Sequence, residues 1–313
     1  MKAIITGMGS HIPDKVLTNF DLEKMVETSD EWIRTRTGIQ ERRISSKEDL
    51  AWKYAAKAGK KALEDAHLSP EEIDGIICGG VYSEYIYPSM AALVQKELGC
   101  TNAWAFDMQA ACTFTVYAMH TALPHIETGR ARNILIIGSE LFSRALDWTD
   151  RNTCVLFGDA AAALVLSATE EEGRGVLSSV AHAKGSMVVY QEHYHSATPF
   201  VKMDGPALYR EAVTLLEAAT REACEKAGVL PADLDLLVPH QANLRIMDAV
   251  AKRLEVPLEK IPVVLDRYGN TSGTSVILAM IDAREKGMLK QKDLVAITAI
   301  GGGLVWGTVL LRW

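Results

Sequence analysis

Short apolar runs alternate along the chain with longer segments in which apolar residues recur every three or four positions. The short runs are rich in β-branched residues and end in Gly, Pro or charge, so they predict buried strands. The longer segments predict helices with one apolar face. The clearest strands are residues 73–81, 132–140, 160–168, 234–240 and 293–303, and the clearest helices are residues 49–66 and 208–228. This alternation indicates an α/β fold in which helices cover the sheets.

A faint internal repeat accompanies this pattern. Residues 62–77, shifted by 161 positions, align with residues 223–238, and each copy reads as a helix, a Pro-bearing turn and a buried strand. The same shift carries Cys112 onto Gly273. We therefore expect two related halves that share one body, because no Gly/Ser/Pro-rich linker separates them. The expected halves are residues 1–168 and residues 169–313.

Composition narrows the class of protein. The chain is 48% hydrophobic and 23% charged, and its net charge of -7 argues against a general role in nucleic-acid binding. The N-terminus lacks the apolar core of a signal peptide, and no run reaches the roughly 20 apolar residues of a membrane span. Five cysteines without a CxxC pair argue against disulfides and structural zinc. We expect a cytoplasmic enzyme with reduced thiols, no metal and no membrane association, in which His193 and His195 lie in a loop or surface strand.

Three separate segments carry reactive side chains. Cys112 follows two alanines at the start of a helical pattern, where unpaired N–H groups should lower the thiol pKa and bind an oxyanion. His240 follows a buried strand, at the edge where α/β folds place function. Asn270 lies in a turn before a helix. A thiol, an imidazole and a carboxamide suit covalent acyl chemistry on a thioester. The other cysteines are interpreted as buried and structural: Cys78, Cys100, Cys154 and Cys224.

The order Cys, His, Asn also occurs in papain-like cysteine proteases. That alternative is disfavoured because 111 residues precede Cys112, whereas a papain nucleophile lies near the mature N-terminus. The CGSCW-type surroundings and a disulfide framework are absent from the sequence as well.

Several motifs run from end to end of the chain in a fixed order. They are TSDEWIRTRTGIQERR, the Ala-Ala-Cys turn, DWTDRNT, VLFGDAAAA, VPHQANLRI, DRYGNTS and GGGLVWG. In these motifs the chain resembles β-ketoacyl-acyl carrier protein synthase III, a condensing enzyme of the thiolase superfamily. The resemblance implies a five-layer αβαβα thiolase-like fold with two pseudo-repeated halves, a homodimer, and no bound organic cofactor. It also implies an acyltransferase that condenses a short acyl-CoA primer with malonyl-acyl carrier protein, with loss of carbon dioxide, to begin fatty acid synthesis.

The resemblance assigns roles to individual residues. Cys112 is implied to be the nucleophile, while His240 and Asn270 donate hydrogen bonds to the thioester oxygen during decarboxylation. The N–H groups of Cys112 and Gly302 are the implied oxyanion hole. The implied coenzyme A contacts are Trp32, Arg36, Arg151, Ala242 and Asn243, the acyl-pocket residues are Tyr87 and Phe114, and the carrier-protein docking residues are Arg210, Arg245, Lys252 and Arg253. Tyr87 corresponds to a residue inserted by the partner subunit, and its bulk favours a short primer.

The chain departs from the family pattern near the substrate rather than at the three reactive residues. Thr113-Phe114-Thr115 stands where a small residue followed by Gly-Phe is usual, and Pro206 stands where Asn is common. Residues 183–202 form a shorter stretch than usual. These departures concern the acyl pocket and the coenzyme A contacts.

Other functions on the same fold stay open as alternatives. One is an acyltransferase or starter-unit ketosynthase of a secondary pathway. A non-decarboxylative long-chain Claisen enzyme needs a carboxylate base where Tyr87 stands, and the nearest carboxylate, Glu84, is expected at the surface. A non-catalytic carrier-protein-binding module would have no use for the three reactive residues together.

Overall fold

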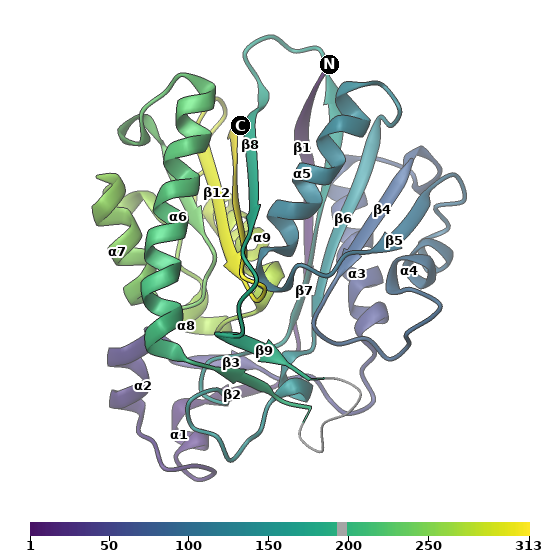
Figure 1. Ribbon diagram of the computed structural model, residues 1–313. Coiled ribbons are helices and arrows are strands. Elements are labelled where there is room, and N and C mark those ends of the chain that lie inside the picture. The colour runs from purple at the N-terminus through teal and green to yellow at the C-terminus, as the bar shows by residue number, and fades with distance from the viewer. Residues whose placement is uncertain (193–198) are drawn as a thin grey trace.

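Two β-sheets form the framework of the protein, and the computed structural model describes residues 1–192 and 199–313 (Figure 1). The predicted positions of His193 and His195 lie outside the described residues. In spatial order, the first sheet contains β1 (Lys2–His11), β7 (Ala160–Thr169), β6 (Asn133–Glu140), β4 (Gly75–Gly79) and β5 (Trp104–Asp107). The second contains β11 (Leu236–Pro239), β12 (Leu294–Gly301), β13 (Val305–Arg312) and β8 (Gly175–Ala183).

Helices fill the space between the sheets and cover their outer faces (Figure 1). The inner helices are α5 (Phe114–Glu127) and α9 (Ser275–Glu285). Outside the first sheet are α3 (Ala51–Ala66) and α4 (Met90–Leu98), and outside the second are α6 (Gly205–Ala227) and α7 (Leu244–Leu254). Consecutive layers are therefore helix, sheet, helix, sheet, helix, which confirms the predicted five-layer thiolase-like architecture.

The sequence of the inner helices explains their place. The first six residues of α9, Ser275 to Met280, are all buried, and α5 buries eight of its residues. A helix without a polar face must be covered all round. Both helices pack with strands of the two sheets in one continuous core cluster. By contrast, α3 and α6 keep exposed charged faces, which suits an outer layer.

Shorter elements complete the chain, and several gather at one end of the sheets, at the bottom of Figure 1. These elements are β2 (Val16–Thr18), α1 (Asn19–Leu22), α2 (Asp30–Thr37), β3 (Glu41–Arg43), β9 (Val189–Gln191), β10 (Val201–Met203) and α8 (Leu265–Tyr268). The 3-10 turns are η1 (Pro70–Glu72), η2 (Ala111–Thr113), η3 (Phe142–Ala145), η4 (Pro231–Asp233), η5 (Leu258–Lys260) and η6 (Ser272–Thr274). No helix in the described ranges combines the length and apolar character that a membrane crossing requires.

The two sheets repeat one topology. β4 and β6 are parallel and β6 and β7 antiparallel, and the second sheet has the same arrangement for β11, β12 and β13. The 161-residue shift seen in the sequence superimposes the bounds of β6 on those of β12, of η1 on η4, and of η2 on η6. Even a side-chain contact repeats, because Asp74 and Asp235 accept the N–H groups of Asn133 and Leu294. The repeat extends well beyond residues 62–77, although the division at residue 168 stays a prediction.

The halves differ in their connecting segments. Residues 141–159 join β6 to β7, whereas only residues 302–304 join the corresponding strands β12 and β13. A second long segment, residues 12–50, joins β1 to α3 and carries α1 and α2. These additions lie outside the repeated framework and supply part of the site described below.

Candidate active site

The nucleophile predicted from the sequence lies in a strained turn at the start of α5. Ala111 has φ +44, a left-handed conformation that non-glycine residues seldom adopt, and Cys112 follows it in η2. β12 ends directly against this turn at Gly301. A Cβ on Gly301 would lie 2.6 Å from the Cys112 backbone nitrogen, so only glycine permits this approach. The residue Cys112 is only partly exposed in this turn, and its thiol lies beside its own N–H group.

Asn270 is held by both its backbone and its side chain. Its N–H donates to the Leu156 carbonyl at 2.8 Å, and its carbonyl accepts from Gly158 at 3.1 Å. The side-chain oxygen Oδ1 accepts the Ser272 N–H at 2.8 Å. Because Oδ1 is occupied in this way, the Nδ2 group is the part of the amide left to donate to another molecule.

His240 is placed by the end of β11. Its N–H donates to the Thr298 carbonyl at 2.8 Å, which continues the parallel pairing with β12. Ring atom Nδ1 lies 2.7 Å from the Ser275 hydroxyl, which also accepts the Gln241 N–H at 3.2 Å. The hydroxyl can donate its own proton to Nδ1 while it accepts that N–H. In the tautomer in which Nδ1 accepts this proton, Nε2 carries the ring proton and is a donor.

One short segment links all three reactive residues. Asn270 opens it, the Ser272 hydroxyl donates to Cys112 Sγ at 3.4 Å, and Ser275 orients His240. The structure thus brings together, through residues 270–275, side chains that are up to 158 positions apart in the sequence. The second half supplies this segment at the place where the first half supplies Cys112.

Burial dominates the ionisation of the site and corrects one sequence-based prediction. Desolvation raises the pKa of Cys112 to about 12, whereas a helix start was expected to lower it. The Ser272 hydrogen bond opposes that rise, and the charge of Glu140 adds to it. The free-energy cost of removing a thiolate from water is larger here than the stabilisation that the N-terminus of the helix gives it. Desolvation likewise lowers the pKa of His240 to about 4, so the imidazole is neutral at physiological pH.

The sequence pointed to neither Ser272 nor Glu140. Glu140 ends β6 and is fully buried, and its oxygens accept the N–H groups of Gly273 at 3.2 Å and Val81 at 2.8 Å. Ser272 is also fully buried and has φ +50. The 161-residue shift could have pointed to both residues. It aligns Ser272 with Ala111, which precedes Cys112, and it aligns Glu140 with Gly301.

The five predicted coenzyme A residues are connected by short contacts or by their neighbouring places in the chain. The Arg151 guanidinium is 4.8 Å from the centre of the Trp32 ring, a cation–π distance. Asn243 Nδ2 donates to the Arg36 carbonyl at 3.1 Å, joining α2 to the start of α7. Ala242, which lies next to Asn243 in the chain, donates its N–H to the His240 carbonyl at 2.9 Å. A continuous path therefore runs from the aromatic and basic side chains to the reactive imidazole.

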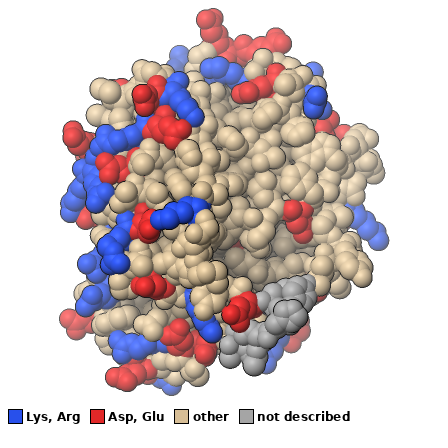
Figure 2. Space-filling view, in the orientation of Figure 1, with Lys and Arg blue, Asp and Glu red and all other residues tan. Residues whose placement is uncertain are grey.

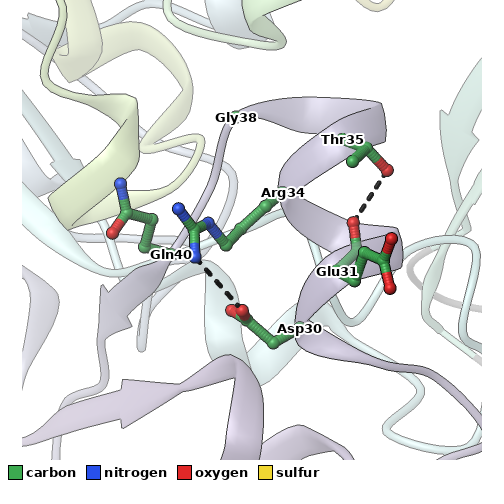
Figure 3. Close-up of a pocket in the computed structure, with 6 residues that line it drawn as sticks. All are labelled: Asp30, Glu31, Arg34, Thr35, Gly38 and Gln40. Carbon is green, nitrogen blue, oxygen red and sulfur yellow. Dashed lines mark hydrogen bonds and ion pairs between the residues drawn. The ribbon is translucent and has the colours of Figure 1, made fainter.

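A hollow of about 420 Å³ lies on another side of α2 (Figure 3). The Arg34 guanidinium points at Asp30, 3.4 Å away, and the Thr35 hydroxyl donates to the Glu31 carbonyl. Gly38 and Gln40 complete the lining. Trp32 and Arg36 do not line it. They lie four residues apart and therefore share one side of α2, which is not the side that carries Asp30 and Arg34. Two of its three charged side chains, Arg34 and Asp30, are paired with each other, and none of its lining residues is a predicted coenzyme A contact.

The remaining pocket residues have contrasting environments. Tyr87 is 85% exposed and follows the exposed Ile86, whereas Phe114 is 1% exposed. Phe114 packs so closely on Gly79 and Gly273 that a Cβ on either glycine would meet its side chain. The bulk of Phe114 is thus accommodated in the core by glycines, and its role as an acyl-pocket residue stays a prediction, as does that of Tyr87.

Gly302, the second predicted oxyanion residue, is adjacent to the nucleophile turn. A Cβ on Gly302 would lie 3.8 Å from the Ala111 Cβ, while its neighbour Gly301 makes the closer approach to Cys112. Gly301 is therefore required for packing against η2, whereas a Cβ on Gly302 would make only ordinary van der Waals contacts. The oxyanion assignment of Gly302 stays a prediction.

The predicted docking residues are exposed along α6 and α7, but two of them are already paired with acids. Lys252 lies 2.7 Å from Asp248, and Arg253 lies 3.1 Å from Glu217. Figure 2 shows basic and acidic side chains side by side on the flank where Figure 1 places these helices. Arg245 instead lies 5.9 Å from the centre of the Tyr209 ring. Arg210 and Arg245 are the two members without an acidic neighbour within ion-pair distance among the described residues.

Two further expectations can be compared with the structure. Glu84 is not a surface residue: its side chain is 11% exposed, accepts the Ala51 N–H at 2.6 Å and lies 3.4 Å from Arg144. Its carboxylate is thus committed to the start of α3 and the segment after β6. The prediction that the other four cysteines are buried is confirmed, and all five thiols are free.

The fold and the site are those of a thiolase-like condensing enzyme, an acyltransferase. Family models described as 3-oxoacyl-[acyl-carrier-protein (ACP)] synthase III match residues 106–185, and the C-terminal domain of the same family matches residues 224–313. Together these ranges cover the nucleophile turn and the segment from Asn270 to Ser275.

Individual relatives agree over the full length. The chain is 47% identical over 327 aligned positions to a β-ketoacyl-[acyl-carrier-protein] synthase III of Symbiobacterium thermophilum, covering 99% of this chain and 97% of the relative. The crystal structure of 3-oxoacyl-[acyl-carrier-protein] synthase III from Aquifex aeolicus superimposes with a TM-score of 0.95 at 46% identity, covering 99% of this chain and 100% of the other. A priming β-ketosynthase from the R1128 polyketide pathway superimposes with a TM-score of 0.94 at 31% identity, covering 99% and 96%. The chain belongs to the β-ketoacyl-[acyl-carrier-protein] synthase III family.

Proposed function

We propose that this enzyme condenses a short acyl-CoA primer with malonyl-acyl carrier protein, releases carbon dioxide, and delivers the first β-ketoacyl-acyl carrier protein of fatty acid synthesis. The observation that carries the proposal is the segment from Asn270 to Ser275, which contacts Cys112 and orients His240. A thiol, an imidazole donor and an amide donor in one buried place match this two-stage reaction. The starter-unit alternative is not favoured, because the priming ketosynthase is less similar in sequence than the synthase III relatives.

The first stage is transfer of the acyl group to the thiol. Cys112 Sγ attacks the thioester carbonyl, and the coenzyme A thiolate departs. Negative charge collects on the carbonyl oxygen as the sulfur bonds. The Cys112 N–H, which Gly301 leaves uncovered by any side chain, is placed to receive that charge, with the Gly302 N–H as its proposed partner.

The second stage is decarboxylation and carbon–carbon bond formation. Loss of carbon dioxide from the malonyl group leaves an enolate whose oxygen needs hydrogen-bond donors. Nε2 of His240 and Nδ2 of Asn270 are the donors that the local hydrogen bonds leave available. One donor of this kind typically contributes about 3–4 kcal/mol to stabilising a developing oxyanion. The enolate carbon then attacks the acyl-enzyme and displaces Cys112 as the thiolate.

Coenzyme A recognition is proposed for the cluster built by Trp32 and Arg151, with Arg36, Ala242 and Asn243 on the path to the site. An aromatic face can stack on adenine, and guanidinium groups bind phosphate in a fixed geometry. The acidic carrier protein is proposed to dock on Arg210 and Arg245, with Lys252 and Arg253 at the edge of the same flank. No resident cofactor is needed, because the proposed steps use groups of the chain and of its two substrates.

A homodimer is proposed from the exposed apolar segment after β4. Tyr85, Ile86 and Tyr87 are 50%, 69% and 85% exposed, an unusual cost for three consecutive large side chains in water. Seated against a second copy, Tyr87 would limit the length of the acyl group. A cytoplasmic location remains the expectation from the cysteine content, and cell fractionation tests it.

Mass spectrometry tests the proposed function directly. The protein is incubated with acyl-CoAs of different length and branching, and the mass increment on Cys112 is mapped. Addition of malonyl-acyl carrier protein should then release carbon dioxide and form β-ketoacyl-acyl carrier protein. The Cys112→Ala variant should form no adduct while retaining malonyl decarboxylation. If the unmodified protein acquires no adduct from any acyl-CoA, the result would favour a non-catalytic carrier-protein-binding module over a condensing enzyme.

A further inference from the structure

Arg42 is a buried cation in β3 that the two proposed stages do not use. Its side chain is fully buried, and within the described residues its three hydrogen bonds all go to uncharged oxygen atoms. Burial lowers the pKa of Arg42 to about 10, so the guanidinium stays charged at physiological pH. A buried charge held only by neutral acceptors is costly, and an apolar side chain would avoid that cost. The reason for an arginine here therefore lies in the acceptors that it reaches.

The guanidinium joins the two long connecting segments described above. Nη1 donates to the Leu17 carbonyl at 3.2 Å and to Asn19 Oδ1 at 2.9 Å, and both acceptors belong to residues 12–50. Nη2 donates at 2.7 Å to the carbonyl of Val155, which lies 113 positions further along the chain, between β6 and β7. A planar fork of fixed donors suits acceptors that come from different directions.

Val155 lies at the start of the stretch that holds the backbone of Asn270. The next residue, Leu156, accepts the Asn270 N–H at 2.8 Å, and Gly158 donates to the Asn270 carbonyl at 3.1 Å. These two bonds form an isolated parallel bridge. One end of the bridge is therefore fixed, one residue earlier, by the hydrogen bond from Arg42.

The stem of Arg42 packs against both sides of this bridge. A Cβ on Gly158, on one side, would lie 2.9 Å from the Cβ of Arg42, and a Cβ on Gly269, on the other side, would lie 3.2 Å from it. The residue after Arg42 adds a backbone contact, because the Arg43 carbonyl accepts the Asp159 N–H at 2.8 Å. The stretch is thus bonded to β3 as well as to the segment that follows Gly269.

We propose that Arg42 is a positioning residue that fixes the Asn270 carboxamide for decarboxylation, and this inference rests on the proposed role of Asn270 as a donor to the enolate oxygen. Arg42 acts through residues 155–158 and does not touch the substrate. While the backbone of Asn270 is held by the bridge, its Oδ1 is held by the Ser272 N–H at 2.8 Å, so Nδ2 has one direction. Without the guanidinium the Val155 carbonyl loses its donor, the bridge can shift, and Nδ2 moves away from the enolate oxygen.

The test compares two reactions of the same site in the Arg42→Met variant. Methionine replaces the stem with an adaptable apolar chain and supplies no donor. Carbon dioxide release from malonyl-acyl carrier protein should show a kcat about 10–10²-fold lower with KM nearly unchanged, since a misplacement of about 1 Å can cost as much as 10²-fold. Alkylation of Cys112 by iodoacetamide, mapped by mass spectrometry, should keep its rate, because no hydrogen bond of Arg42 reaches η2 or η6. Equal losses of both reactions would indicate a structural role and overturn the proposal.

A double variant shows whether Arg42 acts through Asn270. Asn270→Ala alone should lower decarboxylation about 10²–10³-fold. Adding Arg42→Met should lower it by no more than about a further 2-fold, because the residue that Arg42 positions is already gone. Two losses that multiply would overturn the proposal, as would a folded Arg42→Met with the unmodified kcat. If Asn270→Ala itself has no effect, the proposed function of Asn270 is wrong, and this inference falls with it.

Two further variants separate positioning from stability. Arg284→Met removes an arginine that lies 2.6 Å from Asp65 and joins α9 to α3, and the folded variant should keep both rates. Arg42→Lys keeps the charge but replaces the planar fork with one compact donor group, so it should also lose decarboxylation selectively. If Arg42→Met does not fold, Arg42→Lys decides, and a folded Arg42→Lys with the unmodified kcat then overturns the proposal.

Discussion

Ala111 and Ser272 lie 161 positions apart and adopt the same left-handed backbone conformation, with φ of +44 and +50. Each begins a 3-10 turn that leads into an inner helix, and the two turns face each other where the halves meet. One turn presents the thiol and the other presents the hydroxyl that contacts it. The active site is therefore built at the junction of the duplicated units, with each unit contributing one strained turn.

The close approach of Gly301 to this turn should be indispensable. Gly301→Ala places a Cβ 2.6 Å from the Cys112 nitrogen and 3.0 Å from the Thr113 nitrogen, so η2 must shift. Displacing the oxyanion donor should reduce acyl-enzyme formation about 10²-fold or more. Rapid-quench mass spectrometry measures this rate. Gly205→Ala is the matched control, because open space surrounds its Cβ position; a similar loss there would contradict the explanation.

The two donors should matter more for condensation than for acylation. His240→Ala and Asn270→Ala should each reduce malonyl decarboxylation about 10²–10³-fold, since each removes a hydrogen bond to the enolate oxygen. Ser275→Ala should produce a smaller loss of the same kind, because Nδ1 of His240 is then no longer fixed. Separate assays of acyl-enzyme formation and carbon dioxide release distinguish the stages. Equal losses in both assays would be inconsistent with these roles.

His240 should also make stability depend on pH. Its pKa falls from 6.5 in the unfolded chain to about 4 in the folded protein, so between these values the unfolded state binds the extra proton. Stability from this group is present above pH 6.5 and is lost as pH falls toward 4, by at most about 3 kcal/mol at about 1.4 kcal/mol per pKa unit.

Glu140 has the opposite effect in an overlapping range. Its raised pKa, about 7 against 4.5, gives stability that is lost as pH rises through that interval.

Urea unfolding of the unmodified enzyme and of the His240→Gln variant isolates the contribution of the histidine. The stability of the unmodified enzyme relative to the variant should decrease as pH falls from 6.5 to 4.5. A constant difference in stability between the two proteins over that range would contradict the lowered pKa of His240.

Loss of the cation–π pair should weaken coenzyme A binding selectively. Arg151→Ala should raise the KM for acyl-CoA about 10-fold and leave kcat nearly unchanged. The reason is that the guanidinium, which lies against Trp32, is proposed to bind coenzyme A and takes no part in the bond changes. Arg34→Ala is the matched control, since Arg34 lies on α2 but lines the hollow of Figure 3 and pairs with Asp30. An equal rise in KM for both variants would refute the assignment to Trp32 and Arg151.

Carrier-protein docking should respond to charge at Arg245. Arg245→Glu should raise the KM for malonyl-acyl carrier protein about 10-fold without changing that for acyl-CoA, and the effect should shrink at high salt. Arg253→Glu should have a smaller effect, because Arg253 already lies 3.1 Å from Glu217. Steady-state kinetics with each substrate varied in turn measure both constants. Parallel changes in the two KM values would exclude a docking role.

Periodicity was sufficient to predict strands that are buried and uninterrupted, such as β6, β7 and β12, and the long helices α3 and α6. It did not distinguish β1, in which Gly7 and Gly9 break the apolar run. The structure explains both glycines: a Cβ on Gly9 would lie 2.5 Å from the Ala58 carbonyl oxygen of α3. A glycine required by tertiary contact looks, in sequence, like a weakness in the strand.

The site could be predicted only as far as residue types and motifs carry chemistry. Cys112, His240 and Asn270 stood out because their side chains are reactive. Ser272 and Glu140 did not, since serine in a turn and glutamate at a strand end are common. The direction of the Cys112 pKa was predicted wrongly for a related reason: a helix start is visible in sequence, whereas the depth of burial depends on the whole fold.

The long segments that distinguish the halves separate two tasks. Arg151 lies in the residues that join β6 to β7, and Trp32 lies in those that join β1 to α3. Neither belongs to the duplicated core that holds the reacting groups. A descendant of this chain could therefore acquire specificity for a different thioester carrier through changes in these two connecting segments alone, while the reactive residues of the core stay unchanged.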